Sequence, residues 1–408
     1  MEQAESRRRS AYLAGAVLLF AAAVVIRFMF GDELSRFPVD LRVYRAGADA
    51  IRHGDPLYAL RMPDNGLAFT YPVFAALVFI PFSLAPFWLA KVALAAISLT
   101  ALMAISVCAV RMTGLRRFPH AVSLSLAIAG LALFTEPVTR TFRLGQINLI
   151  VVALILLDMT VLRNTRWHGA LIGLATGIKV TPGLFIVYLL AIGRRRAAAT
   201  GMAAFATTVA LGLIVQPGQA WAFWTDHMLD PNRVGGVSYI SNQSILGVVS
   251  RLLADDYPPR LLTLGLGAVV VAAGLWGARL LERRGDELLA VNAVALATLL
   301  ASPISWAHHW VWFVPALVAL ATTVCPDRLR TGDPGAWLKS VAALGWAILF
   351  LVGPMWRLPH NPVRDDIGLT PWQALVAASY CLAGTCYLIW LLSRAAALRP
   401  SRNEARAV

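Results

Sequence analysis

The residues that could do chemistry begin with Asp40, in the charged stretch FPVDLRVYRAGADAIRHGDPLY (residues 37–58) that follows a long apolar run. A helix beginning just after Pro38 would separate apolar and charged side chains onto two faces, which predicts an amphipathic helix at the membrane surface. The apolar face comprises Leu41, Tyr44, Ala48 and Ile51, and the charged face Arg42, Arg45, Asp49 and Arg52. The Asp40 carboxylate could cap the helix or act as a catalytic base at the mouth of a cavity. The two roles are partly compatible, because capping would keep the carboxylate ionised and fixed in place.

Lys179 is a cation within the apolar run GALIGLATGIKVTPGLFIVYLLAIG (residues 169–193). A charge at the bilayer centre costs at least about 2.5 kcal/mol, so an intramembrane lysine is a functional candidate. Its position beside Pro182, a helix breaker, suits a phosphate-binding role. The alternative is that the side chain extends to the membrane interface.

A histidine pair, His308 and His309, lies in ASPISWAHHW (residues 301–310). Adjacent helical side chains point about 100° apart, so the pair is unsuited to holding one metal ion. We expect one histidine to be structural and the other to bind a phosphate oxygen or to orient a sugar hydroxyl. No metal site and no cofactor are expected.

Two further stretches place amides at the start of apolar runs. LGQINL (144–149) contains Gln146 and Asn148, and SNQS (241–244) contains Asn242 and Gln243. These side chains could cap helices. They could equally provide the paired donors and acceptors that sugar hydroxyls require.

The elements that must position these residues are membrane helices. Of the 408 residues 58% are hydrophobic and only 14% charged, and apolar runs near the 20-residue length of a span recur throughout. This predicts an all-α, polytopic membrane protein, with Ala11–Phe30 as a retained first span and no separate soluble domain. The net charge of +14 does not indicate nucleic acid, because many basic residues fall in short loops between spans. It suits membrane lipids or a phosphate-bearing substrate. The four cysteines have no metal or disulfide spacing.

Basic loops predict the orientation of the spans. Segments 281–287, 325–333 and 393–408 should be cytoplasmic, with spans at about 260–281, 288–302, 310–325, 337–355 and 373–392 between them. Four polar loops then converge on the external face: 31–68, 217–259, 302–310 and 356–372. We expect about eleven full crossings, plus short elements such as 71–86.

The segment 169–193 lies between the basic clusters 163–168 and 194–196 but is long enough for only one crossing. Both clusters can be cytoplasmic if it is a broken, re-entrant pair of half-helices with Lys179, Thr181 and Pro182 at its tip. The alternative is a continuous span that leaves 163–168 outside.

Six segments in this order resemble glycosyltransferase family 87: FPVDLRVYRAGADAIRHGDPLY, TYPVFAALVFIPF, LGQINL, ATGIKVTPGLF, SNQS and ASPISWAHHW. The resemblance covers about residues 37–310. It implies a single GT-C transmembrane domain over residues 1–408, with its active site on the external face of the plasma membrane. It further implies a polyprenyl-phosphate-mannose donor, a glycolipid acceptor such as a phosphatidylinositol mannoside, and an α-1,2 linkage.

The resemblance also assigns roles to residues. The acid of the family's first external loop matches Asp40 within loop 31–68, and its Ser-Trp and histidine pair match Ser305, Trp306, His308 and His309. Ala307 stands where some relatives are expected to carry a polar residue. We therefore predict Asp40 as the catalytic residue. The predicted ligands of the donor phosphate are Lys179, His308, His309 and Arg42. The predicted ligands of the sugar or acceptor are Tyr44, Gln146, Asn148, Asn242, Gln243 and Trp306.

A phosphate-linked donor has a good leaving group, so one base suffices, unlike glycoside hydrolysis with its two carboxylates. A β-linked donor and an α-linked product imply inversion. The alternatives are a lipomannan or lipoarabinomannan mannosyltransferase, a lipid or sugar transporter, and a structural partner in a cell-envelope complex. A transporter predicts polar groups reached from both faces in turn, whereas these gather on one side.

Overall fold

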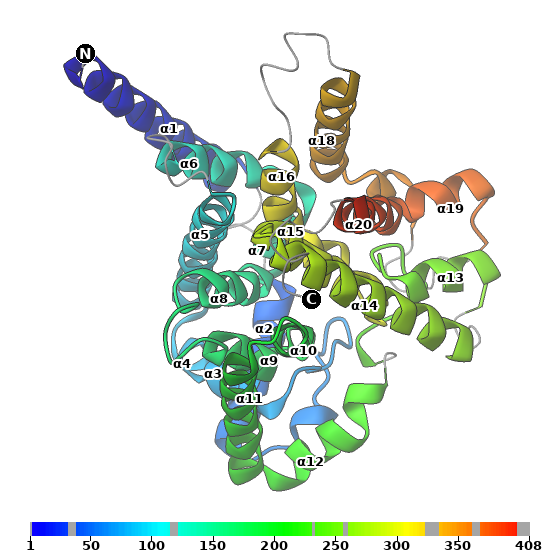
Figure 1. Cartoon of the computed structure of the whole chain (residues 1–408). Coiled ribbons are helices and arrows are strands. Elements are labelled where there is room, and N and C mark those ends of the chain that lie inside the picture. The colour runs from blue at the N-terminus through cyan, green and yellow to red at the C-terminus, as the bar shows by residue number, and fades with distance from the viewer. Residues whose placement is uncertain are drawn as a thin grey trace.

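The computed structural model describes residues 2–31, 38–114, 121–230, 233–255, 260–322, 334–360 and 368–397. These residues form a helical bundle without a β-sheet, and α1 projects from it along α6 (Figure 1). The basic segment 325–333 and the tail from residue 398 lie outside the described residues, as do parts of three of the four polar loops. The predicted all-α membrane architecture is confirmed.

The helices vary widely in length. The α-helices are α1 (Glu2–Phe30), α2 (Val39–His53), α3 (Val73–Val78), α4 (Ile80–Leu84), α5 (Phe87–Met112), α6 (Ala121–Ala132), α7 (Glu136–Leu144), α8 (Asn148–Thr160), α9 (Ala170–Ile178), α10 (Gly183–Ala191), α11 (Arg195–Val215), α12 (Pro217–Thr225), α13 (Ile245–Leu253), α14 (Arg260–Arg283), α15 (Glu287–Ala301), α16 (Phe313–Thr322), α18 (Pro334–Val352), α19 (Pro371–Ala377) and α20 (Ser379–Ala397). Short 3₁₀ turns are η1 (Leu57–Ala59), η3 (His227–Leu229), η5 (Ala307–Trp312) and η6 (Pro354–Arg357).

Five helices in the described ranges are long and apolar enough to cross a membrane, or six if the bent pair α6 and α7 forms one span. The five are α1, α5, α11, α14 and α20, and the α6–α7 pair bends by 69°. The sequence predicts about eleven crossings. The structure has fewer long helices than this because several of the apolar runs divide into shorter helices. α8 and α15, for example, have 13 and 15 residues.

The predicted break in segment 169–193 is confirmed. α9 ends at Ile178 and α10 begins at Gly183, and Lys179 between them has an extended backbone (φ −145°, ψ 125°). The short predicted element 71–86 is likewise divided, into α3 and α4.

The basic ends of the helices gather on one side of the bundle. Arg163, after α8, and Arg194, after α10, both bind Glu282 Oε1 at the end of α14, at 3.0 and 3.3 Å. Arg163 also pairs with Glu287 at the start of α15. The clusters 163–168 and 194–196 therefore lie on the same side as 281–287, as the broken pair predicts.

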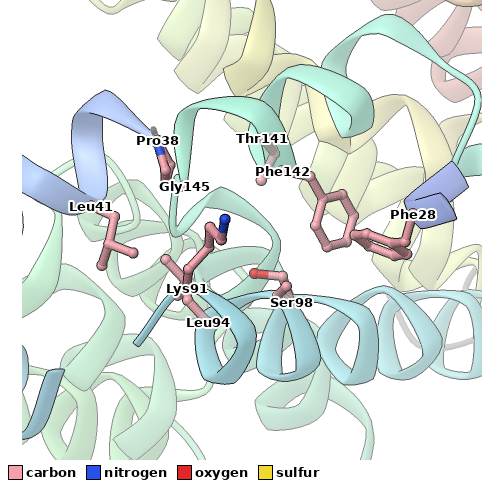
Figure 2. Close-up of a pocket in the computed structure, with 10 residues that line it drawn as sticks. Phe28, Pro38, Leu41, Lys91, Leu94, Ser98, Thr141, Phe142 and Gly145 are labelled. Atoms are coloured by element: carbon pink, nitrogen blue, oxygen red, sulfur yellow. The ribbon is translucent and has the colours of Figure 1, made fainter. Parts of the chain in front are cut away.

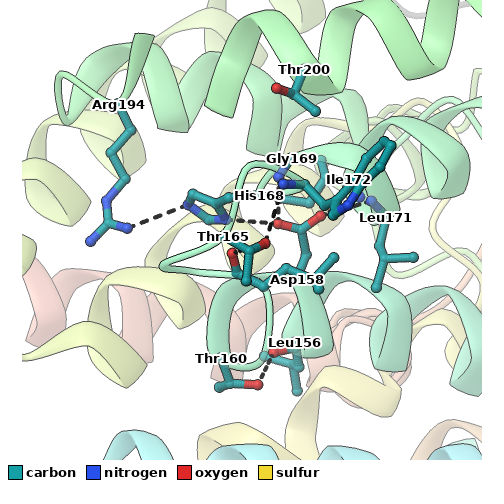
Figure 3. Close-up of polar contacts among 12 residues, drawn as sticks. Leu156, Asp158, Thr160, Thr165, His168, Gly169, Leu171, Ile172, Arg194 and Thr200 are labelled. Atoms are coloured by element: carbon teal, nitrogen blue, oxygen red, sulfur yellow. Dashed lines mark hydrogen bonds and ion pairs between the residues drawn. The ribbon is translucent and has the colours of Figure 1, made fainter. Parts of the chain in front are cut away.

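Asp158 fixes the turn from α8 into α9 (Figure 3). Its buried carboxylate accepts the backbone N–H groups of Gly169, Leu171 and Ile172 at 2.7–3.2 Å, and the ring Nδ1 of His168 lies 2.8 Å away. The N–H groups at the start of a helix have no partners within it, so this carboxylate acts as the cap of α9. It thereby sets how α9, which leads to Lys179, lies against α8, which begins at Asn148.

The polar loops meet at the opposite ends of α8, α9 and α15. Tyr58 N donates to Gln219 Oε1 (3.1 Å), which ties the second predicted external loop to the first. Asn242 Nδ2 donates to Pro303 O (3.1 Å), and the rings of Tyr239 and Trp356 lie 6.3 Å apart. The predicted convergence of the four loops is confirmed for their described parts.

The amphipathic helix α2 has the two predicted faces but not the predicted neighbour. Leu41, Tyr44, Ala48 and Ile51 are buried, and α2 contacts α3, α4 and α7. The prediction that this face lies on the membrane surface is therefore wrong. It packs into the protein core, because the short helices α3 and α4 supply the apolar surface that lipid was expected to supply.

Candidate active site

Asp40 lies in the first turn of α2, close to the end of α7. The residue at the cap position is Pro38, and no side chain caps the helix. The interpretation of Asp40 as an N-cap is therefore wrong. Its Oδ2 instead accepts a hydrogen bond from Gln146 Nε2 at 2.8 Å. The carboxylate is thus held by a residue more than one hundred positions away in the chain.

A glycine permits this approach of α2 to α7. Gly145 has φ +70°, which a side chain would disfavour, and a Cβ there would lie 2.9 Å from the Cβ atoms of both Leu41 and Pro38. Figure 2 shows Pro38 and Leu41 facing Gly145, with Lys91 and Ser98 of α5 lining the small cavity beneath. Because Gln146 follows Gly145, this close contact brings its amide to Asp40.

Two tyrosines extend the network from Gln146. Tyr44 donates its hydroxyl to Gln146 Oε1 (2.8 Å), and the hydroxyls of Tyr44 and Tyr71 lie 3.1 Å apart. The rings also make an edge contact, with centroids 5.4 Å apart. The sequence analysis predicts Tyr44 and Gln146 as site residues but misses Tyr71, whose only sequence signal is its place beside Pro72 at the start of a short broken segment.

Lys179 lies in the break between α9 and α10. Its Nζ donates to Asn148 Oδ1 at 2.9 Å, lies 3.0 Å from His309 Nε2, and is 5.8 Å from the centroid of the Tyr71 ring. The structure thus brings together Lys179, Asn148 and His309, which the sequence places in three separate motifs.

Burial and charge shape the acidity of Asp40. Burial raises its pKa to about 6, while the Gln146 hydrogen bond and the positive charge of Lys179 act in the opposite direction. A carboxylate in this range is ionised at pH 7 to 8 and is a stronger base than an exposed aspartate.

The two histidines have different surroundings. His309 contacts Lys179, whereas both ring nitrogens of His308 are buried without a hydrogen-bond partner among the described residues. The ring planes are nearly perpendicular, with centroids 4.9 Å apart. The backbone of His308 is anchored, because its carbonyl accepts from Asn148 Nδ2 (3.1 Å) and Thr141 Oγ1 (3.5 Å).

A small cavity of about 40 Å³ opens beside Lys179 and His309. Its polar lining comes from Asn148, Thr181, Thr298, Ser302 and Ser305 as well as these two residues. Within the described ranges, no three His, Cys, Asp or Glu side chains lie together as a metal site would require. The arrangement can accept a proton at Asp40 and bind an anion at Lys179.

Two predicted sugar ligands do not belong to this site. Asn242 and Gln243 are fully buried, and each uses both amide donors and its acceptor on backbone groups. Asn242 joins its loop to Pro303 and Ser305, and Gln243 joins it to the start of α20. Neither has hydrogen-bonding capacity left for a hydroxyl. The capping alternative holds for their neighbour Ser244, which accepts from Gly247 N at 3.0 Å.

The other predicted residues lie at the edge of the network or outside it. Arg42 forms a 2.6 Å ion pair with the exposed Asp64. Trp306 is half-buried and packs edge-on against Tyr239, with centroids 6.0 Å apart. Ala307 is buried, and its backbone N–H donates to Ser241 Oγ at 3.3 Å.

Comparison with known proteins identifies the family. The model of glycosyltransferase family 87 matches residues 69–303, more than half of the chain. The chain belongs to this family. It is 35% identical over 89% of its length to a polyprenol-phosphate-mannose-dependent alpha-(1-2)-phosphatidylinositol pentamannoside mannosyltransferase of Mycobacterium tuberculosis, covering 84% of that protein. A relative with the same description in Mycolicibacterium smegmatis is 35% identical over 86% of the chain and 84% of its own length.

A third relative is a polyprenol-phosphate-mannose-dependent alpha-(1-2)-phosphatidylinositol mannoside mannosyltransferase of Mycobacterium tuberculosis, 33% identical over 90% of the chain and 84% of that protein. No solved structure matches. The resemblance drawn from six sequence segments is thus confirmed. Membership of the family makes the chain a membrane glycosyltransferase, so the Asp40 to Lys179 network belongs to an enzyme.

Proposed function

We propose that this enzyme transfers mannose from polyprenyl-phosphate-mannose to a phosphatidylinositol mannoside and forms an α-1,2 linkage. The observation that carries the proposal is the Asp40–Gln146–Tyr44–Tyr71 network close to Lys179, Asn148 and His309. It combines one proton acceptor with one half-buried cation in a chain 35% identical to mannosyltransferases of that description.

In the proposed mechanism, Asp40 is the catalytic base. It takes the proton from the acceptor hydroxyl as the hydroxyl oxygen bonds to C1 of mannose. The bond from C1 to the phosphate oxygen breaks, and its electron pair leaves with the phosphate. Asp40 is the only carboxylate in the network, which suits a donor that needs no protonation of its leaving group. A single displacement at C1 inverts its configuration.

Lys179 is proposed to stabilise the leaving phosphate. An ammonium group at a helix break can approach a phosphate oxygen and offset the negative charge that develops as the bond to C1 breaks. His309, within contact of Lys179, would hold that side chain toward the cavity. Asn148, which binds Lys179 and the carbonyl of His308, would keep the two parts of the site in register.

We place the site on the external face of the membrane. The support is the separation of charge along the helices: α8 and α15 each begin or end at the site and extend about 20 Å to the side where the basic clusters gather. Basic segments flanking spans remain in the cytoplasm.

The test of the function is transfer of labelled mannose by the purified full chain. Polyprenyl-phosphate-[³H]mannose is supplied with a panel of phosphatidylinositol mannosides, lipomannan and lipoarabinomannan, and the product linkage is read by α-1,2-mannosidase digestion. Transfer to phosphatidylinositol mannosides supports the proposal. Transfer only to lipomannan or lipoarabinomannan would show that this polymer, and not a phosphatidylinositol mannoside, is the acceptor. Movement of the donor across vesicle membranes without transfer to any acceptor would indicate a transporter.

The test of the face is cysteine labelling in intact cells from a background without native cysteines. Cysteines at positions 232 and 361 should react with an impermeant maleimide, whereas Thr165→Cys on the basic side should react only after permeabilisation. Protection of both 232 and 361 in intact cells would contradict the external site.

A further inference from the structure

We propose that Arg140, together with His308, forms a second anion-binding site that takes the phosphodiester of a substrate lipid. This inference rests on the proposed function for the identity of the lipids. Both substrates carry the required chemistry, a phosphodiester next to a sugar or cyclitol ring, and the experiment below distinguishes them.

The guanidinium of Arg140 is held in a fixed orientation. Its Nε lies 3.1 Å from Glu136 Oε1, and its Cζ lies 3.4 Å from the centroid of the Trp356 ring. Glu136 is fixed in turn, because its two oxygens accept hydrogen bonds from Trp356 Nε1 (2.7 Å) and the Tyr380 hydroxyl (3.0 Å). A stacked, laterally bound guanidinium has lost much of its rotational freedom before any ligand arrives.

The two terminal nitrogens of Arg140 have no hydrogen-bond partner among the described residues, and its side chain is 29% exposed. Stacking uses the face of the guanidinium and Glu136 uses Nε, so the forked end remains available. This fork matches two oxygens of one phosphate group.

His308 supplies an independent sign of a ligand near Arg140. The residue is 6% exposed, and both of its ring nitrogens lack a partner in the described part of the chain. Buried polar groups normally have partners, so an imidazole left unsatisfied beside a substrate site indicates a missing ligand atom.

The two residues are neighbours. Thr141, next to Arg140, donates to the carbonyl of His308, and α7 packs against η5. Arg140 and Lys179 are both close enough to act electrostatically on the His308 ring.

The charge around His308 favours an anion. Arg143, one turn along α7, is close enough to act on Arg140. Around this second site, the two cations Arg140 and Arg143 outnumber the single carboxylate of Glu136 by one. A phosphodiester carries one negative charge and would balance the cluster.

Aromatic rings connect Arg140 to a predicted sugar ligand. Trp356 packs against Tyr239 with centroids 6.3 Å apart, and Tyr239 packs against Trp306 at 6.0 Å. All three rings are half-buried. A row of partly exposed aromatic side chains next to a guanidinium suits a ligand that joins a sugar ring to a phosphate, so Trp306 could contact the sugar while Arg140 binds the phosphate.

The experiment measures equilibrium binding of two labelled probes, polyprenyl monophosphate and phosphatidylinositol, to the full chain in nanodiscs. The first carries the phosphate of the donor and the second that of the acceptor. The variants are Arg140→Gln and Arg140→Lys. The matched control is Arg166→Gln, because Arg166 also stacks on a tryptophan, with its Cζ 5.1 Å from the Trp167 ring, but lies on the basic side of the bundle.

We expect Arg140→Gln to weaken binding of one probe at least tenfold, Arg140→Lys to weaken the same probe less, and Arg166→Gln to bind both probes normally. Weaker binding of polyprenyl monophosphate assigns the site to the donor, and weaker binding of phosphatidylinositol assigns it to the acceptor.

Arg140→Lys keeps a cation beside Glu136, so it protects the test if Arg140→Gln fails to fold. A folded Arg140→Lys variant that binds both probes as tightly as wild type would overturn the proposal. If wild-type protein binds a probe through Arg140 and yet transfers no mannose, that result counts against the proposed function and not against this site.

Discussion

Replacing Gln146 by leucine should move the acidic limb of the pH–rate profile. The Gln146 amide is the only side chain with a hydrogen bond to Asp40 in the described structure, through a 2.8 Å contact to Oδ2. This bond stabilises the ionised carboxylate, so its loss should raise the pKa of Asp40. Leucine is close to glutamine in size, so the change removes the donor while largely preserving the packing.

The size of the shift follows from the strength of the bond. A hydrogen bond to a charged group contributes about 1.5–3 kcal/mol net. One pKa unit corresponds to about 1.4 kcal/mol, and the Asp40 side chain is half-buried, so we expect a shift near the lower end, about one unit. The wild-type pKa is about 6. As a base, Asp40 must be ionised, so activity should fall as the pH drops through about 6 in wild type and about one unit higher in Gln146→Leu.

The assay is kcat/KM for mannose transfer from pH 5 to 9, which reports groups in the free enzyme. Tyr44→Phe is the matched control. Its hydroxyl binds Gln146 Oε1 and not Asp40, so its limb should stay close to that of wild type. A Gln146→Leu limb at the wild-type pH, or at lower pH, would refute the reasoning.

Three further predictions concern other parts of the molecule. Lys179→Ala should raise the KM for polyprenyl-phosphate-mannose at least tenfold with little change in the KM for acceptor, because its ammonium is proposed to meet the donor phosphate; unchanged donor kinetics in a folded variant would remove Lys179 from that role. Gln243→Ala should lower the free energy of unfolding by about 2 kcal/mol or more, because it leaves buried backbone groups unpaired, but it should preserve both KM values. An altered KM with unchanged stability would instead show that this amide contacts a substrate. Asp158→Ala leaves the N–H groups at the start of α9 without their partner and should lower the free energy of unfolding by about 3 kcal/mol or more. The measurement is the unfolding temperature in detergent, and a variant as stable as wild type would show that the cap is dispensable.

The sequence predicts the position of the site well where the signal is local. A lysine three residues before a proline inside an apolar run marks a helix break, and the break occurs at Lys179. Basic clusters at both ends of that run favour a re-entrant course over a continuous span, and the shared contacts of Arg163 and Arg194 with Glu282 support it.

Side-chain direction is the part that the sequence does not predict. Gln146, Asn148, Asn242 and Gln243 all precede apolar runs, yet the first two reach the site and the last two are saturated by backbone groups. An amide's partners depend on which distant segment packs against it. Gln243 meets α20, more than one hundred residues later, and no local pattern records that contact.

The error over α2 has a similar cause. Its two faces follow from the spacing of Leu41 and Tyr44, but the pattern does not distinguish lipid from a protein neighbour as the partner of an apolar face. Likewise, capping is common for an aspartate near a helix start, but Asp40 lies two positions beyond the cap residue, and Gly145 allows Gln146 to reach it instead. Asp158 was missed because a single carboxylate at the end of an apolar run has no distinctive spacing.

The most direct test of Asp40 as the base is mannose transfer by purified Asp40→Asn protein, measured beside a thermal unfolding curve. Burial destabilises the ionised form of Asp40 and raises its pKa from 3.8 to about 6. This shift corresponds to about 3 kcal/mol of lost folding stability above pH 7. Asparagine removes that charge and still offers an oxygen to Gln146, so the variant should be at least as stable as wild type. General-base assistance contributes typically about 10²–10⁴-fold, so we predict a loss of that size in kcat with the fold intact. Near-native transfer by a folded Asp40→Asn variant would contradict the account and would direct the search for the base to Asp49, Asp55 or His308.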